Sequence, residues 1–222
     1  MKKIIFTVML VALTATATMA QDRETFEARK ELRKLAKDEL NAKATKSARK
    51  EAKKLAKEGW QSAPGALPLE KQLDRSYLMQ MEYDEDMFPK YMMAERMSIG
   101  SNYDAAKMQA VALAKEDLAG QINTEITALV ENSVANEQLE ANEAVSITKS
   151  IQEGMGRIQG NIGRVITVTE VYLTLKNKTK EVLVRIAYNS QMAKAAAKKA
   201  IKEDLEQQSE ELRSKLDDII GW

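Results

Sequence analysis

Residues 164–188 read RVITVTEVYLTLKNKTKEVLVRIAY, and they decide the fold because they form the densest run of β-branched and aromatic residues in the chain. The polar stretch NKTK at 177–180 interrupts the run once, which predicts a β-hairpin with its turn there. The first arm is apolar on both faces, which predicts a strand inside a sheet rather than at its edge. One face of the second arm is expected to carry Val182, Val184, Ile186 and Tyr188.

Two further elements complete the predicted body. Residues 90–98 (KYMMAERMS) alternate apolar side chains and are expected to form a strand. A helix is expected to begin at Ser101, where Asp104 completes an approximate capping box. Its amphipathic stripe is the strongest in the chain: Ala105, Met108, Val111, Ala112, Leu118, Ala119, Ile122, Ile126, Leu129 and Val130. The expected fold is α+β, a small antiparallel sheet of strand 90–98 and hairpin 164–188 packed by this helix, with long charged helices at both ends.

The composition predicts four segments along the chain. Residues 1–20 have the lysine-containing start, apolar run and small-residue cleavage site of a signal peptide. Residues 21–58 are expected to form one charged helix, and 59–68 (GWQSAPGALP) a linker rich in Gly and Pro. Residues 69–222 are expected to be an α+β domain that ends in a helix running from Asn189 to about Asp218.

The amino-acid composition excludes several kinds of chemistry. The chain contains no Cys and no His, so a zinc site of the usual ligands, a Cys nucleophile, a Ser-His-Asp triad and an imidazole acid or base are all excluded. The net charge of +1 gives no indication of a nucleic-acid partner. Neither a cofactor nor a metal ion is predicted.

Local motifs add no catalytic prediction. The glycines at 154–160 are spaced like part of a dinucleotide loop, but they follow a helical stretch and precede a strand, which is the reverse of what that loop requires. The Ser-x-x-Lys matches at 47–50 and 146–149 lack the companion motifs of a serine acyl enzyme. Carboxylates are plentiful, but the aromatic residues that line a sugar cleft are few. We therefore expect a protein that is not an enzyme.

The predicted helix 22–58 is the best candidate for an interaction surface. It holds thirteen Lys or Arg against eight Asp or Glu, a net charge of +5. Interleaved acids favour a solvated helix with internal ion pairs, and the alternative is a basic arm that touches lipid headgroups, polysaccharide or an acidic partner. Trp60 is expected either to fix the helix to the body or to stack on a ligand. The candidate interaction residues are Lys46, Arg49, Lys50, Lys53 and Trp60.

Two runs of sequence resemble known bacterial envelope proteins. They are AAKMQAVALAKEDLAGQI at 105–122 and EVLVRIAYNSQMAKAA at 181–196. The pattern resembles the Lpp-twenty-type envelope lipoproteins and the N-terminal domain of flagellar assembly protein T. The resemblance covers about 90–200 and implies an exported, non-enzymatic α+β protein that is often oligomeric. The lipidated Cys of those lipoproteins is absent here, so attachment by lipid is not implied.

These observations give two functional hypotheses. The first is an exported structural or interaction protein, periplasmic or associated with the outer membrane, that binds copies of itself or another envelope protein. The second is a module that binds a polysaccharide or an anionic lipid surface through the basic helix 22–58. Salt sensitivity of binding is expected in the second case.

Overall fold

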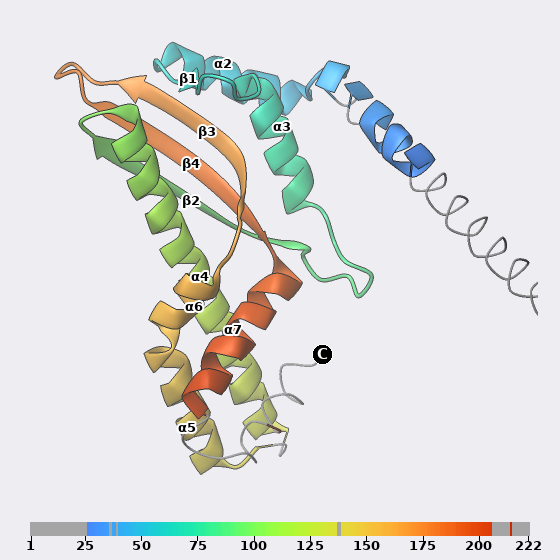
Figure 1. Ribbon diagram of the computed structural model, residues 1–222, viewed down its shortest axis with the longest axis vertical. Coiled ribbons are helices and arrows are strands. Elements are labelled where there is room, and N and C mark those ends of the chain that lie inside the picture. The colour runs from blue at the N-terminus through green and yellow to red at the C-terminus, as the bar shows by residue number, and fades with distance from the viewer. Residues whose placement is uncertain (1–25, 36, 39, 137–138, 206–213, 215–222) are drawn as a thin grey trace, which may run out of the picture. The chain divides into compact units, whose positions relative to one another are not determined.

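The computed structural model describes residues 26–35, 37–38, 40–136, 139–205 and 214 (Figure 1). The chain forms two compact units, Met1–Ala44 and Thr45–Trp222, and the second contains the sheet. The predicted signal peptide and the last part of the predicted C-terminal helix lie outside the described residues. In the part of the chain that is described, no helix is long and apolar enough to span a bilayer.

The sheet is antiparallel and its strands are arranged in the order β1-β3-β4-β2 (Figure 1). The predicted hairpin is confirmed as β3 (Ile166–Thr174) and β4 (Lys180–Asn189), and both arms lie inside the sheet. The predicted strand 90–98 is confirmed as β2 (Tyr91–Gly100), which pairs with β4 along its whole length. The α+β prediction is therefore correct.

Side-chain chemistry explains why the hairpin turns where it does. The Asn177 carboxamide oxygen accepts hydrogen bonds from the Thr179 backbone nitrogen at 3.1 Å and from its hydroxyl at 2.6 Å. Lys178 between them has a φ of 66°, a left-handed conformation that a tight hairpin turn requires. The polar stretch thus supplies a local hydrogen-bonding geometry that ends one strand and begins the next.

One face of the sheet is covered by α4 (Tyr103–Ala135), the longest described helix. The alternate β4 residues Val182, Val184, Ile186 and Tyr188 are all buried in the same apolar cluster as the inner face of α4. Asn102, rather than the predicted Ser101, caps the helix, and its side chain accepts a hydrogen bond from the Ala105 nitrogen at 2.9 Å.

The buried stripe of α4 differs from the prediction over its first half. Met108 is 74% exposed, whereas Ala106, Ala110 and Ala114 are fully buried. Small side chains let the helix lie close to the sheet, so the contact distance, rather than hydrophobicity alone, selects the inward face. From Leu118 to Val130 the predicted and observed stripes agree except at Leu129, which is half-buried.

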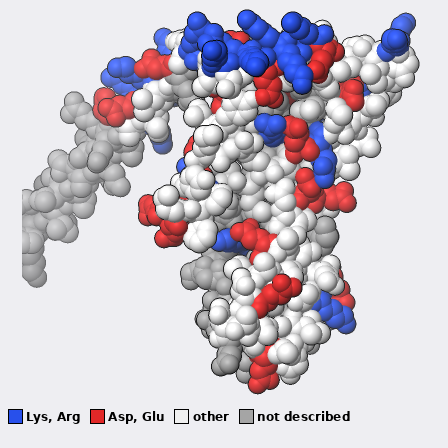
Figure 2. All heavy atoms as spheres, turned by 180° about the vertical axis from the view of Figure 1, so that it is seen from behind, with Lys and Arg blue, Asp and Glu red and all other residues white. Residues whose placement is uncertain are grey.

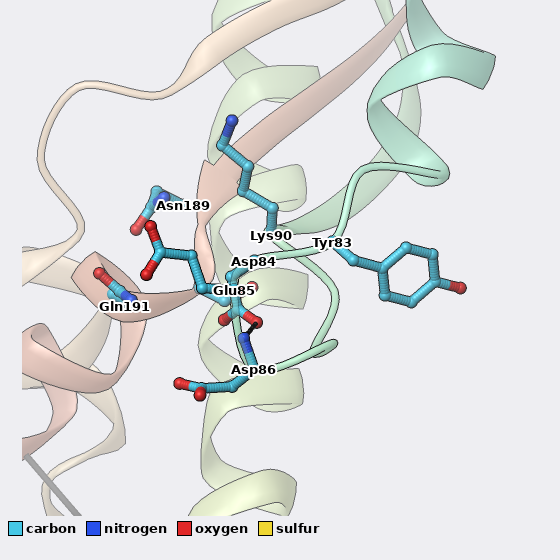
Figure 3. A pocket seen from close by; sticks show the side chains of 8 residues that line it. Tyr83, Asp84, Glu85, Asp86, Lys90, Asn189 and Gln191 are labelled. Carbon is cyan, nitrogen blue, oxygen red and sulfur yellow. Dashed lines mark hydrogen bonds between the residues drawn. The ribbon is translucent and has the colours of Figure 1, made fainter.

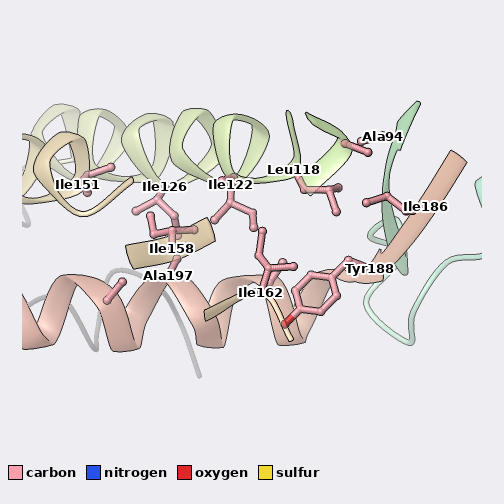
Figure 4. Close-up of a cluster of buried hydrophobic side chains, with 14 of the residues drawn as sticks. Ala94, Leu118, Ile122, Ile126, Ile151, Ile158, Ile162, Ile186, Tyr188 and Ala197 are labelled. Carbon is pink, nitrogen blue, oxygen red and sulfur yellow. The ribbon is translucent and has the colours of Figure 1, made fainter. Parts of the chain in front are cut away.

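Beyond the sheet, α4 is covered by three shorter helices (Figures 1 and 4). These are α5 (Ala141–Glu153), α6 (Met155–Asn161) and α7 (Ser190–Leu205). Figure 4 shows Ile122 and Ile126 of α4 pointing toward Ile158 of α6 and Ala197 of α7. The same buried cluster therefore continues from the sheet into this helical end.

The opposite face of the sheet carries α3 (Leu69–Gln80). Met79 packs with Val168 and Ala187 in a small apolar cluster. The Arg185 guanidinium donates to the Ser76 hydroxyl at 2.6 Å and is paired with the Glu95 carboxylate at 2.6 Å. Glu95 lies on the neighbouring strand and orients the Arg185 guanidinium, and the bond to Ser76 connects α3 to the sheet.

The predicted linker 59–68 contains the fourth strand, β1 (Gln61–Ser62), which pairs with residues 171–172 of β3. Beyond β1, the Gln72 side chain forms hydrogen bonds to backbone groups that no strand pairs with. Its carboxamide oxygen accepts from the Glu170 backbone nitrogen at 2.6 Å, and its nitrogen donates to the Leu67 carbonyl at 2.6 Å. A single buried side chain thus satisfies backbone groups at this edge.

The prediction of one helix over 21–58 is wrong. The described residues between 26 and 41 are helical, but the chain leaves the helix at 42–45, and a new helix, α2 (Lys46–Lys57), begins. Thr45 caps α2 by accepting from the Ala48 nitrogen at 3.3 Å, and its own nitrogen donates to the Asp74 carboxylate at 3.1 Å. The compact unit therefore begins at Thr45 rather than at the predicted residue 69, because α2 belongs to it.

Replacement of Gly100 by Ala is expected to destabilise the fold. A Cβ at Gly100 would lie 2.5 Å from the backbone nitrogen of Ala106, in the first turn of α4. Because backbone cannot move aside cheaply, we expect a loss of about 1–3 kcal/mol in the free energy of unfolding. Chemical denaturation measures this loss. Gly163→Ala is the control, since nothing lies within 4 Å of its Cβ, and an equal loss in both variants would contradict the close contact.

Candidate functional site: the lysine face of α2

The exposed side of α2 carries a continuous stripe of lysines. At 3.6 residues per turn, Lys46, Lys50, Lys53 and Lys57 fall within an arc of about 60°, and Lys54 extends it to about 100°. All five side chains are exposed. Figure 2 shows Lys and Arg side chains gathered along the end of the molecule that carries α2. The helix therefore presents one strongly cationic surface.

The other side of α2 holds the helix on the folded body. Ala48 and Ala52 are buried, and α2 packs on α3. The Tyr77 hydroxyl of α3 donates a hydrogen bond to the Glu51 carboxylate. Together with the Thr45–Asp74 contact, this bond fixes the position of the lysine stripe relative to α3.

A groove of about 730 Å³ runs between the two helices. Leu55 and Tyr77 provide its apolar part, and Glu51 lies beside them. Its other lining residues are Ser47, Lys50, Lys53, Lys54 and Lys57. Lysine stems are apolar and only the ammonium group needs water, so the groove combines an apolar lining with a cationic rim.

The lysine stripe is electrostatically unfavourable in isolation. Lys46 and Lys50, Lys50 and Lys54, and Lys53 and Lys57 are each four residues apart, and such like-charge pairs destabilise a helix by about 0.2–0.5 kcal/mol each. Among the residues that the structure describes, no carboxylate forms an ion pair with any of these lysines. A bound anionic group would relieve this repulsion, so the surface is suited to receive negative charge.

The hydrogen bond beneath the stripe involves a tyrosine with a perturbed pKa. Partial burial and the hydrogen bond to Glu51 raise the pKa of Tyr77 to about 12, so its hydroxyl remains a donor across the ordinary pH range. Glu51 is the one acidic residue among the described residues that line this groove. It is held by Tyr77 rather than by a lysine.

The predicted interaction residues differ in how far their side chains are exposed to solvent. Lys46, Lys50 and Lys53 are exposed on the stripe, whereas Arg49 lies at its margin and is half-buried. Trp60 is also half-buried, follows the end of α2 and does not line the groove. Sequence reasoning missed Lys54 and Lys57, which the same helical spacing would have included. It also missed Leu55 and Tyr77, and the participation of Tyr77 carries no local sequence signal because it lies on α3.

A second hollow, of about 490 Å³, lies between the loop after α3 and the start of α7 (Figure 3). Asp84, Glu85 and Asp86 line it together with Lys90 and residues 189–191. The Asp84 carboxylate accepts hydrogen bonds from the backbone nitrogens of Asp86 and Phe88, at 3.1 and 2.8 Å, and so serves the loop itself. No group of three carboxylates in the described chain is arranged to hold a metal ion.

The raised pKa of Tyr77 predicts a pH dependence of stability. The unfolded phenol loses its proton near pH 10 and the folded one near pH 12, so the folded state binds more protons between these values. The stabilising contribution is therefore complete below pH 10 and is lost as the pH rises to 12. Denaturation across this range should show a smaller decline for Tyr77→Phe than for the wild type. Tyr83→Phe, which alters an exposed tyrosine, should leave the decline unchanged, and equal declines in all three proteins would contradict the assignment.

Comparisons with known proteins identify no match for this chain. No protein-family model matches the chain, and no curated protein and no solved structure matches it either.

Proposed function

We propose that the protein is an exported, non-catalytic structural protein of the cell envelope that assembles with copies of itself or with another envelope protein. In this proposal the groove between α2 and α3 is the receiving surface. The observation that carries the proposal is the combination of an apolar lining, from Leu55 and Tyr77, with a rim of lysines that have no ion-pair partner among the described residues.

The chemistry of the groove supports a polypeptide as its ligand. An apolar side chain flanked by carboxylates would bury its hydrophobic surface against Leu55 and Tyr77 while its acids meet the lysine ammonium groups. Burial of apolar surface favours binding, and charge complementarity supplies orientation and a fast approach. A uniformly polar ligand would leave the apolar lining unused.

The remaining parts of the proposal come from the sequence. Export rests on the signal-peptide pattern of residues 1–20, and the envelope location rests on the resemblance of 105–122 and 181–196 to envelope proteins. The non-catalytic role rests on the absence of Cys and His and of any catalytic motif in its proper context.

An anionic lipid surface is the second candidate ligand, and polysaccharide is an outcome of the same test. The observation that favours lipid is the exposure of five lysines on one arc, because each lysine near an anionic membrane contributes about 1 kcal/mol. Co-sedimentation with vesicles of anionic lipid distinguishes the candidates. Binding to vesicles by a protein that stays monomeric would favour the lipid, and binding only to acidic glycans would favour the polymer.

Reversal of two groove charges is expected to weaken self-association. The Lys50→Glu/Lys54→Glu variant replaces attraction for carboxylates by repulsion, so association measured by analytical ultracentrifugation should weaken at least about tenfold. Wild-type association should also weaken as salt rises, since the lysines are exposed.

The matched control is Lys149→Glu/Lys199→Glu, which makes the same change in net charge at exposed lysines on α5 and α7. It should associate like the wild type. A wild-type protein that remains monomeric at every accessible concentration would overturn assembly with copies of itself, as would equal weakening by both double variants.

A further inference from the structure

The loop between α3 and β2 carries an unusual concentration of exposed apolar side chains. Met87 is 75% exposed and Phe88 is 60% exposed. Met81 and Tyr83, on the way into the loop, are 75% and 55% exposed. Figure 1 shows this segment projecting away from the sheet. Large exposed side chains that cluster in this way mark interaction sites on soluble proteins.

Hydrogen bonds hold the loop in one shape. The Asp84 backbone nitrogen donates to the Phe88 carbonyl at 2.9 Å, and the Met87 nitrogen donates to the Asp84 carbonyl at 3.1 Å. Met87 has a φ of 63°, which a non-glycine residue adopts only under such constraint. The Ser190 hydroxyl anchors the loop by donating to the Pro89 carbonyl at 2.6 Å. The apolar tip is therefore preorganised, so binding would order little further chain.

Exposed acids accompany the apolar tip. Glu85 and Asp86 immediately precede Met87 and are exposed. Figure 3 shows Glu85 and Asp86 pointing away from the side on which Tyr83 lies. The loop therefore offers an apolar pair with two neighbouring carboxylates, which is the chemistry that the groove between α2 and α3 is suited to accept.

We propose that this loop inserts into the α2–α3 groove of a second copy of the chain. The inference rests on the proposed self-assembly and names the two surfaces that meet. Met87 and Phe88 would contact the apolar lining around Leu55 and Tyr77, and Glu85 and Asp86 would face Lys50 and Lys54. The occupant is a second copy because the same chain displays both a cationic groove and an anionic loop of matching chemistry.

The contact is head-to-tail, because the two surfaces are different patches of the molecule. After the first contact forms, one copy keeps a free groove and the other keeps a free loop. Such heterologous contacts extend into chains, or close into rings when the rotation between copies allows. Association should therefore continue beyond a dimer as concentration rises.

Charge reversal on each surface tests the pairing directly. Variant one is Glu85→Lys/Asp86→Lys, and variant two is Lys50→Glu/Lys54→Glu. In either variant alone, loop and groove have the same sign, so each should associate at least about tenfold more weakly than the wild type. In an equimolar mixture, the cationic loop of variant one matches the anionic groove of variant two, and the unchanged loop and groove also match. Sedimentation velocity of the mixture should show association restored.

The apolar contribution needs a separate variant. Met87→Asn/Phe88→Ser keeps a residue tolerant of positive φ at 87 while removing both apolar side chains, and it should also associate at least about tenfold more weakly. Met108→Asn/Val145→Ser, at two other exposed apolar positions, is the matched control and should associate like the wild type. Melting temperatures establish that each variant is folded.

Three results separate the possibilities. Weak association of each charge variant with recovery in the mixture supports the loop–groove contact. Wild-type association that is lost in the groove variant but unchanged in both loop variants overturns this inference and leaves the proposed function standing. A wild-type protein that stays monomeric overturns this inference together with the proposed self-association.

Discussion

The packing of α4 against the apolar face of β4 is the contact on which the rest of the structure depends. β4 is hydrogen-bonded on both sides, and Val182, Val184 and Ile186 are fully buried beneath α4. At 1.5 Å per residue, the 33 residues of α4 span about 50 Å, whereas the 10 residues of β4 span about 33 Å. Its second half therefore needs another apolar cover, which α5, α6 and α7 provide. A single helix thus joins a sheet-based core to a helical one.

Periodicity predicted the parts of the fold whose burial is decided by hydrophobicity. The alternation in β4 and the isoleucine-rich half of α4 belong to this class. The parts of the fold that the sequence did not predict depend on contacts with residues that are distant in the sequence. β1 is two residues long and exists because β3 offers an edge, while Gln72 completes that edge from another helix. The break before α2 depends on Asp74, 29 residues away, which binds the Thr45 nitrogen. No local propensity contains that information.

The residues of the candidate site can also be divided into those that the sequence could predict and those that depend on distant contacts. Lys46, Lys50 and Lys53 could be assigned to one face from helical spacing alone, because a stripe is a property of one element. The groove is a property of two elements. Tyr77 contributes to it only because α3 packs against α2 in one orientation, and its hydroxyl donates a hydrogen bond to Glu51 in the same groove. The cationic character of the surface was thus predictable, whereas its apolar lining was not.

Both proposed contact surfaces are fixed to α3. α2 docks on this helix through the contacts of Asp74 and Tyr77, and the loop with Met87 and Phe88 follows its C-terminal end. α3 is itself held on the sheet by the hydrogen bond from Arg185 to Ser76, and Glu95 of β2 pairs with the same guanidinium. Groove and loop therefore cannot move independently of each other without breaking the contacts that Asp74 and Tyr77 make with residues 45 and 51. With a rigid helix of 12 residues setting the relation between the two surfaces, each added copy would be rotated by the same angle, which is the condition for a regular assembly rather than an amorphous one.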